Sequence, residues 1–342
     1  MATPGFYPTS LSAVEKTLSE LERGAASEIG RSAGGRPIWA VSYGEFEPIA
    51  RTANLSAALA ARRPDAFFGV EPRKKQAMLI TSAIHGGEME SIAAVLNLIS
   101  LMETGTDLKG ESWPDLMAAA EQLRLVIVPC LNPDGRARIP ADDPTIWSNA
   151  EIEKYRHGLH ADVTPITWPA CKVPHPRDPR QDGFLGSYFN DAGVNPLHGV
   201  FLSPEIAPET HAALALALAE TPDLVLDLHS CGVGPFFIAG DPAIPENYNR
   251  RSHYLDGFLR RSLRDRLGIH KDYTWTGGER ALTFPSACHH VCGALPIIFE
   301  GPHGAQEGLR YSHAQIVDMY LTMFEALMTV GVREGFKPHA DW

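Results

Sequence analysis

The stretch QAMLITSAIHGGEMESIAAVLNLISLM, residues 76–102, indicates the class of fold, because it is predicted to join a buried strand to a helix through one short turn. Residues 76–84 are a nearly continuous apolar run, which is typical of a strand that is covered on both faces. The segment His-Gly-Gly-Glu (85–88) interrupts this run, and a helix is predicted over residues 90–102. A strand followed by a helix in this way is the repeating unit of α/β proteins.

The same alternation continues in both directions along the chain. Further strands are predicted at residues 37–43, 123–131, 223–228 and 295–299. Further helices are predicted at residues 12–24, 211–220 and 313–330. Strands that alternate with helices indicate an α/β sheet. The sequence contains no internal repeat, so we expect a single α/β domain that extends over residues 1–342.

Residues 139–204 differ from the rest of the chain. They are rich in Pro, Gly, Asp and His and show little hydrophobic periodicity. A long irregular segment in a compact domain is usually functional or disordered. We therefore interpret residues 139–204 as a loop-rich segment that lies over the active site and belongs to the same domain.

Charge and composition exclude several classes of protein. The formal charge is -11, from 30 basic and 41 acidic residues, and phosphate binding needs a basic face, so nucleic acid is not an expected partner. No apolar run reaches about 18 residues, so no membrane-spanning helix and no membrane partner are expected. The first residues lack a basic and apolar leader, and the five cysteines are few and odd in number. Both features favour reduced thiols and a cytoplasmic location, and the oligomeric state stays open.

Polar side chains that can bind a metal or move a proton stand where predicted strands stop. His85, His229 and Glu300 each follow such a strand, and ligands in open α/β sheets bind beyond the carboxyl ends of strands. Glu88 lies three residues after His85, with two glycines between them that allow a tight turn. Two histidines and one carboxylate with an open fourth position are typical of a catalytic zinc site. His85, Glu88 and His229 are therefore the predicted metal ligands.

A hydrolase also needs a carboxylate that accepts and passes on a proton. The open position of a zinc site holds water, whose pKa the metal lowers to about 7. Glu300, in the segment IIFEGPHG, is the candidate for the proton-transfer group. A single histidine in a chain with 14 of them is more often structural, so the prediction depends on the whole set of residues. Other divalent ions also suit these ligands.

Five segments resemble those of the zinc carboxypeptidases and occur in the order of that family. They are IGRSAGGRPIWAVSYG (29–44), AIHGGEMES (83–91), VIVPCLNPDG (126–135), DLHSCG (227–232) and PIIFEGPHG (296–304). The resemblance implies one α/β domain with a mixed, mostly eight-stranded twisted sheet flanked by helices. It also implies one zinc ion per chain at His85, Glu88 and His229, and Glu300 as general base and then general acid. The implied substrate is a small peptide or an amino acid conjugate.

One segment departs from the family pattern. Peptidase members bind the terminal carboxylate of the substrate with an Asn-Arg pair in a segment like Gly-Val-x-x-Asn-Arg, but here Leu197 and His198 stand in those positions. A bidentate arginine is hard to replace when a carboxylate must be held. His198 could supply a weaker, pH-dependent contact, and Asn195 is a second candidate for substrate binding. We therefore expect a substrate without an ordinary C-terminal carboxylate.

The arginine that would polarise the scissile carbonyl is not fixed by the motifs. An oxyanion needs a cation or an N–H donor aimed at it. Arg136 and Arg138 follow the Asn-Pro-Asp-Gly turn. We select Arg138 as the catalytic arginine and Arg136 as a substrate-binding residue. Arg156 stays an alternative, because the spacing in the peptidases differs.

The family also has a tyrosine that hydrogen-bonds the substrate and would lie shortly before Glu300. Tyr273 is the only tyrosine in that stretch and is therefore the candidate. Its match to the family segment is poor, so His289 and His290 are alternatives for the same side of the site.

Two motifs invite other interpretations. Residues 30–34 spell the serine-hydrolase pattern G-x-S-x-G, but that motif needs a strand before it and a helix after it. A polar stretch precedes Ser32 and a strand is predicted after it, so a nucleophilic serine is not expected. Cys288 and Cys292 flank two histidines, but their spacing is not that of a common zinc knuckle. We predict reduced thiols in the core at both positions.

Two alternative functions are open at this point. The missing Asn-Arg pair favours a deacylase of N-acyl amino acids, similar to aspartoacylase and succinylglutamate desuccinylase. Those relatives use the same His-x-x-Glu and distant His, although their segments match this chain less well. A metal-binding or ligand-binding protein without catalysis is the second alternative, and the presence of Glu300 argues against it.

Overall fold

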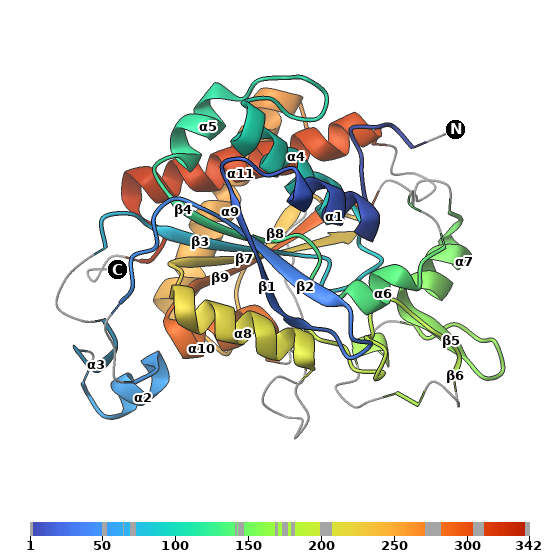
Figure 1. The fold of residues 1–342 in the computed structure, drawn as a ribbon. Helices are drawn as coiled ribbons and strands as arrows, with labels where there is room; N and C mark the ends of the chain where they lie inside the picture. Colours follow the sequence, from blue (N-terminus) through green and yellow to red (C-terminus); the bar gives the residue numbers. More distant parts are fainter. Residues whose placement is uncertain are drawn as a thin grey trace.

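The fold is known from a computed structural model of the chain. It describes residues 3–49, 53–63, 65–68, 73–140, 142, 147–167, 170–172, 177–178, 182–198, 207–270, 282–303 and 311–338. These residues form a seven-stranded sheet with helices on both faces and a separate two-stranded ribbon, so the α/β fold is confirmed (Figure 1).

The main sheet is mixed. Its strands are β1 (Ala25–Arg31), β2 (Pro37–Tyr43), β3 (Ala77–Ser82), β4 (Arg124–Val128), β7 (Leu224–Cys231), β8 (Phe236–Ile238) and β9 (Leu295–Pro302). Their order is β1-β2-β4-β3-β7-β9-β8. Strands β4, β3, β7 and β9 are parallel to one another, whereas β1, β2 and β8 pair antiparallel at the two sides. The four central strands therefore end at the same edge of the sheet.

Helices cover both faces of this sheet. The described helices are α1 (Leu11–Ser19), α2 (Leu55–Ala60), α3 (Asp65–Phe68), α4 (Glu90–Thr104), α5 (Pro114–Ala120), α6 (Pro133–Ala137), α7 (Asn149–Ile152), α8 (Pro208–Glu220), α9 (Glu246–Leu267), α10 (Phe284–Cys292) and α11 (His313–Glu334), and not all of them lie on the sheet. Helices α4, α5, α9 and α11 lie on one face, and α8 and α10 lie on the other (Figure 1). The domain therefore has three layers.

The central strands are mostly apolar and almost entirely buried, because they have a core on each side. In β3, Met78 and Ile80 belong to the core under α4 and α11, whereas Leu79 belongs to the core under α8 and α10. Strand β7 divides in the same way, with Leu226 in the first core and Val225 in the second. This is the period of two that a strand imposes on its side chains.

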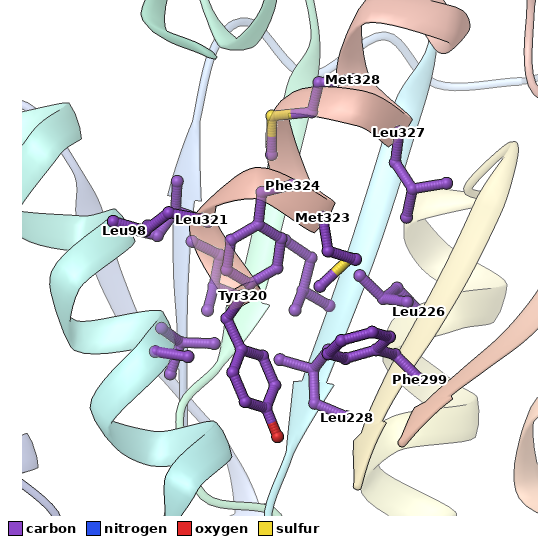
Figure 2. Packing of buried hydrophobic residues seen from close by; sticks show 14 of the residues in the cluster. Leu98, Leu226, Leu228, Phe299, Tyr320, Leu321, Met323, Phe324, Leu327 and Met328 are labelled. Carbon is purple, nitrogen blue, oxygen red and sulfur yellow. The ribbon is translucent and has the colours of Figure 1, made fainter. Parts of the chain in front are cut away.

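Helix α11 fills the first core and also reaches the edge where the central strands end. Phe324 and Tyr320 pack against β7 and β9 beside Leu226, Leu228 and Phe299 (Figure 2). Complete burial of such a side chain stabilises a protein by roughly 1.5–3 kcal/mol. The Tyr320 hydroxyl also donates a 2.7 Å hydrogen bond to the backbone carbonyl of His229, so the core helps to fix that strand end.

Several boundaries differ from those predicted from the sequence. The described sheet has seven strands rather than mostly eight. The predicted helix over residues 12–24 ends at Ser19, and the polar residues after it form the edge strand β1, which is mostly exposed. Strands β7 and β9 extend three residues beyond the predicted ends, so His229 and Glu300 lie inside strands rather than after them.

The described parts of segment 139–204 contain only short elements. After α7, one π-helical turn at Glu153–His157 leads into β5 (Gly158–His160), and a 3-10 turn at Ala170–Lys172 precedes β6 (Asp182–Leu185). Strands β5 and β6 form the two-stranded ribbon. Among the described helices, none is long and apolar enough to cross a membrane.

Candidate metal centre and active site

The three predicted metal ligands come together at the carboxyl edge of the sheet. His85 and Glu88 follow β3, and His229 lies near the end of β7, which pairs parallel with β3. The Nδ1 atom of His85 is 3.0 Å from Glu88 Oε1, and the Nδ1 atom of His229 is 2.9 Å from Glu88 Oε2. All three side chains are buried, and one ligand atom from each lies within 4.8 Å of the others.

These residues fit a zinc ion in number and in the chemistry of their donor atoms. Two imidazole nitrogens and a carboxylate leave one position open, which is the pattern of catalytic zinc sites. Burial raises the pKa of Glu88, but His85 and His229 hold it well below its usual range, so the carboxylate is ionised. Burial lowers the pKa of His85, which keeps this imidazole neutral and able to bind a metal.

A second carboxylate orients His229. Asp227 Oδ2 lies 2.9 Å from His229 Nε2, the ring nitrogen that points away from Glu88. Thr81 donates a 2.7 Å hydrogen bond to the other oxygen of Asp227. Such a partner fixes the tautomer and orientation of a metal-binding histidine. Asp227 is not among the residues predicted from the sequence, although its position two residues before His229 places both on one face of the strand.

The two glycines between His85 and Glu88 are needed for close packing. Neither has a positive φ. A Cβ atom on Gly86 would lie 2.1 Å from the backbone nitrogen of Arg136, and one on Gly87 would lie 2.3 Å from Ser187 Oγ. A side chain at either position would therefore clash with neighbouring atoms. The turn that carries two of the predicted ligands thus requires glycine at both positions.

The candidate proton-transfer group lies beside the metal ligands. Strand β9 pairs parallel with β7, and Glu300 is the register partner of His229. The Glu300 side chain is partly exposed, whereas the three ligands are buried. A partly exposed carboxylate next to a predicted metal ligand is in a suitable position for a general base.

The structure gives the arginines different surroundings. Arg138, the predicted catalytic arginine, donates to the backbone carbonyls of Gly186 and Phe189 at 2.9 and 3.0 Å. It also donates to Asp191 at 2.6 Å, so its guanidinium holds loop residues together. Its predicted role in catalysis gains no support from these contacts.

Arg136, the predicted substrate-binding arginine, also makes structural contacts. Its Nε atom donates a 2.9 Å hydrogen bond to the backbone carbonyl of Thr9, and its guanidinium pairs with Asp142. The side chain is buried, and burial lowers its pKa. These contacts tie the N-terminal residues to the start of segment 139–204.

Arg156, the alternative arginine, lies against the metal ligands. Its Nη2 atom is 3.2 and 3.3 Å from the two carboxylate oxygens of Glu90, and its Nη1 atom donates to the Ser230 carbonyl at 3.3 Å. Ser230 Oγ donates to Glu90 as well, at 2.8 Å. Ser230 follows His229 directly, and Glu90 lies two residues after Glu88. The buried Arg156–Glu90 pair therefore adjoins two of the three ligands.

The other predicted substrate-binding residues are used in other ways or lie outside the described residues. Asn195 donates to the Cys171 carbonyl at 3.2 Å and accepts from the backbone of Leu197 at 3.1 Å. His198 is buried and forms a backbone bridge with Thr283 at the start of α10. Tyr273 lies outside the described residues.

The two alternatives to Tyr273 make contacts with residues other than the predicted metal ligands. His289 Nδ1 is 3.0 Å from the Ala294 carbonyl, and burial lowers the pKa of His289 to about 4. His290 lies between Ser56, at 2.9 Å, and the carbonyl of Ala243, at 2.8 Å. None of these contacts joins either histidine to the metal ligands.

The two misleading motifs have structural roles. Ser32 lies at the turn between β1 and β2, so a strand does precede it, but no helix follows. Its hydroxyl donates a 2.6 Å hydrogen bond to Asp134, which anchors the hairpin. Cys288 and Cys292 are free thiols in the core under α8 and α10, as predicted.

Fold and site together define an α/β protein with a group of residues that could hold one metal ion. A profile of the zinc carboxypeptidase family matches residues 15–256, and the chain therefore belongs to this family of metalloenzymes. The matched residues include all three metal ligands, whereas Glu300 lies beyond them. Membership implies zinc as the metal and a peptide as the substrate. No curated protein sequence matches the chain.

Several solved structures have a similar fold. The metallo-carboxypeptidase from Burkholderia cenocepacia is 17% identical, with a TM-score of 0.58 over 93% of this chain and 68% of that one. The metallo-carboxypeptidase from Pseudomonas aeruginosa is 18% identical, with a TM-score of 0.54 over 93% and 67%. Carboxypeptidase A from Helicoverpa armigera is 15% identical, with a TM-score of 0.57 over 97% and 75%.

Proposed function

We propose that this chain hydrolyses an amide or peptide bond at the His85, Glu88 and His229 centre, with Glu300 as the proton-transfer group. The observation that carries the proposal is the register pairing of Glu300 with His229, which sets a partly exposed carboxylate beside a buried ligand set. A zinc ion held by the three ligands would polarise the scissile carbonyl and lower the pKa of a water molecule.

Glu300 performs both proton transfers. As general base it accepts a proton from the attacking water, and as general acid it delivers that proton to the leaving nitrogen. A positioned carboxylate that serves in this way contributes about 10²–10⁴-fold to the rate. Asp227 keeps His229 in the orientation that leaves its Nδ1 atom facing Glu88.

Arg156 is the better candidate for stabilising the oxyanion. Its Nε atom is buried and has no hydrogen-bond partner among the residues that the structure describes, so one N–H is available for a substrate oxygen. Burial opposes the charge of Arg156, but Glu90 and Glu88 raise its pKa and keep it a cation. The N–H donors of Arg138 that face Gly186, Phe189 and Asp191 are already used.

The test of the catalytic assignment is the variant Glu300→Gln. We expect turnover to fall by about 10²–10⁴-fold, while metal analysis still finds about one zinc per chain. Glu246→Gln changes an exposed glutamate at the start of α9 and is the matched control, with unchanged turnover. Full activity in Glu300→Gln would remove Glu300 from the mechanism and leave the metal site intact.

The substrate is a peptide or amino acid conjugate that lacks an ordinary C-terminal carboxylate. Leu197 and His198 stand where an Asn-Arg pair would be, and the His198 backbone is held in a bridge to Thr283. We expect peptides with an amidated C-terminus to be cleaved faster than the same peptides with a free carboxylate. Faster cleavage of the free acids would contradict this, and cleavage of N-acyl amino acids alone would favour the deacylase function.

A further inference from the structure

The two metal-binding histidines are held by different means. His229 has a carboxylate partner on its Nε2 atom, namely Asp227 at 2.9 Å. The Nε2 atom of His85 is buried and has no hydrogen-bond partner among the described residues. The face of the His85 ring instead stacks on Tyr188, with ring centroids 3.7 Å apart and an angle of 6° between the ring planes. His229 is thus held by a carboxylate at its outer nitrogen, whereas His85 is held by a tyrosine ring against its face.

The turn that carries Tyr188 is fastened to the ligand turn through its backbone. Gly86 donates to the carbonyl of Ser187 at 3.0 Å, and Asn132 donates to the same carbonyl at 3.3 Å. On the other side, the amides of Ser187 and Tyr188 donate to the carbonyls of Tyr155 and Arg156 at 2.9 and 3.0 Å. The backbone of Tyr188 is therefore fixed on both sides, and its burial limits the movement of its ring.

A fixed, parallel ring has a direct consequence for His85. An imidazole without a hydrogen bond on its outer nitrogen can turn about the bond that joins it to Cβ. Tyr188 is itself buried, so rotation of the His85 ring would collide with the tyrosine face. The stack therefore fixes the plane of the His85 ring, and the 3.0 Å contact with Glu88 selects the flip in which Nδ1 faces that carboxylate.

We propose that Tyr188 is a positioning residue of the metal site, which sets the ring plane of His85 and thereby raises the affinity of the site for zinc. The inference rests on the metal site of the proposed function and extends it to a residue of segment 139–204. Groups that orient a metal-binding histidine from behind change metal affinity by about 10–100-fold. The part of Tyr188 that does this is the aromatic face, and the hydroxyl is dispensable.

The test is the zinc dissociation constant, measured by competition with a chelator on the full chain. We expect Tyr188→Leu and Tyr188→Met, which lose the ring, to bind zinc about 10-fold or more weakly. Tyr188→Phe keeps the ring and should bind zinc as the wild type does. Phe189→Leu is the matched control, because Phe189 is buried in the same small cluster and is not stacked on His85.

Each outcome decides the inference. Wild-type affinity in both Tyr188→Leu and Tyr188→Met would overturn it, as would a loss in Tyr188→Phe equal to that in Tyr188→Leu. An equal loss in Phe189→Leu would assign the effect to general loosening of the segment and would also overturn it. Tyr188→Met is the longer side chain and serves if Tyr188→Leu does not fold. A wild type that binds no zinc would instead remove the metal site and the proposed function together.

Discussion

The carboxyl edge of the sheet and the loop-rich segment 139–204 meet at the metal site, and they fix their side chains in different ways. At the sheet edge, the register of β3, β7 and β9 sets the positions of His229 and Glu300. In the segment, Arg156 and Tyr188 are held by an ion pair, a ring stack and backbone hydrogen bonds from a turn. The predicted ligands thus lie at the sheet edge, whereas the segment supplies a ring that stacks on His85 and an arginine that pairs with Glu90, two residues after Glu88.

This difference predicts how each region responds to change. Ligands on paired strands share the stability of the core, because local opening is rarest in the central elements of a fold. Groups on short elements depend on a few contacts each, and loops are the usual carriers of binding and catalytic residues. Loss of a metal ligand at the sheet edge should therefore abolish zinc binding, whereas loss of a supporting residue, on a strand or in the segment, should weaken a function.

The largest effect is expected at the sheet edge, in His229→Ala. This variant removes a ligand and leaves Asp227 and Glu88 buried without their shared partner, which destabilises the fold by roughly 3–5 kcal/mol. Elemental analysis should find about one zinc per chain in the wild type and none in His229→Ala. His157→Ala, in the segment, is the contrasting variant and should keep its zinc. If His229→Ala retained its zinc, the proposed difference between the sheet edge and segment 139–204 would be wrong.

A smaller effect is expected from the arginine of the segment. Arg156→Lys keeps a cation for Glu90 but loses the forked guanidinium, so kcat should fall by about 10²–10³-fold. Arg138→Lys is the matched change at the arginine that holds Gly186, Phe189 and Asp191, and we expect less than about a 10-fold loss in kcat. Steady-state kinetics on both variants compares them directly. A larger loss in Arg138→Lys would return the oxyanion role to Arg138.

The sheet edge could be predicted from the sequence because its signals are local. The apolar runs of β3, β7 and β9 end at or near His85, His229 and Glu300, and parallel strands bring their carboxyl ends to one edge. The family segments gave the same three positions independently. Asp227 was within reach as well, because a residue two positions before His229 in a strand must share its face.

The segment could not be predicted in the same way. The choice between Arg138 and Arg156 depends on the path of the chain between them. Hydrophobic periodicity in the sequence does not predict that path. The stack of Tyr188 on His85 is a contact between a turn and a distant ligand, which leaves no local pattern in the sequence. A motif can show that an arginine is needed, whereas only the folded segment shows that Arg156 lies next to the ligand residues, through Glu90 and Ser230.

Two polar elements outside the site, β1 and α9, are not predicted from the sequence for a related reason. Strand β1 is mostly exposed and lacks an apolar run. Its pairing with β2, and not the burial of apolar side chains, holds it in the sheet. Helix α9 is rich in charged residues, although Leu255, Leu259 and Leu263 form a buried stripe at a spacing of four. That stripe is a helical signal, and counting it against the 3.6-residue period would have revealed the helix.

A moderate effect on metal binding is expected from the carboxylate behind His229. Asp227→Asn keeps the size of the side chain but removes the charge, so zinc affinity should fall by about 10–100-fold. Chelator competition measures this, and the result can be set beside that for Tyr188→Leu. Losses of similar size would mean that a strand-borne carboxylate and a segment-borne ring orient their histidines equally well. Unchanged affinity in Asp227→Asn would show that the strand alone fixes His229.

The smallest effect concerns the pH dependence of the segment and involves His157. Its Nδ1 atom is 2.7 Å from Glu153, and its ring edge contacts Tyr188 at a centroid distance of 4.9 Å. Burial lowers the pKa of His157, but Cys171 and Glu153 outweigh it and raise the pKa to about 9. The folded value exceeds the unfolded one of about 6.5, so the stabilisation is complete below about pH 6.5 and is lost as pH rises through about 9.

Urea unfolding at several pH values tests this. The difference in free energy of unfolding between the wild type and His157→Gln should be on the order of 1–3 kcal/mol larger at pH 6 than at pH 10. Glu153→Gln removes one of the two groups that raise the pKa of His157. In this variant the loss of stability with rising pH should be smaller and should begin at a lower pH. Parallel curves for the wild type and His157→Gln would mean that the segment is held by packing alone. Only Arg156 and Tyr188 would then support the view that the segment is held by side-chain contacts, in contrast to the strand pairing at the sheet edge.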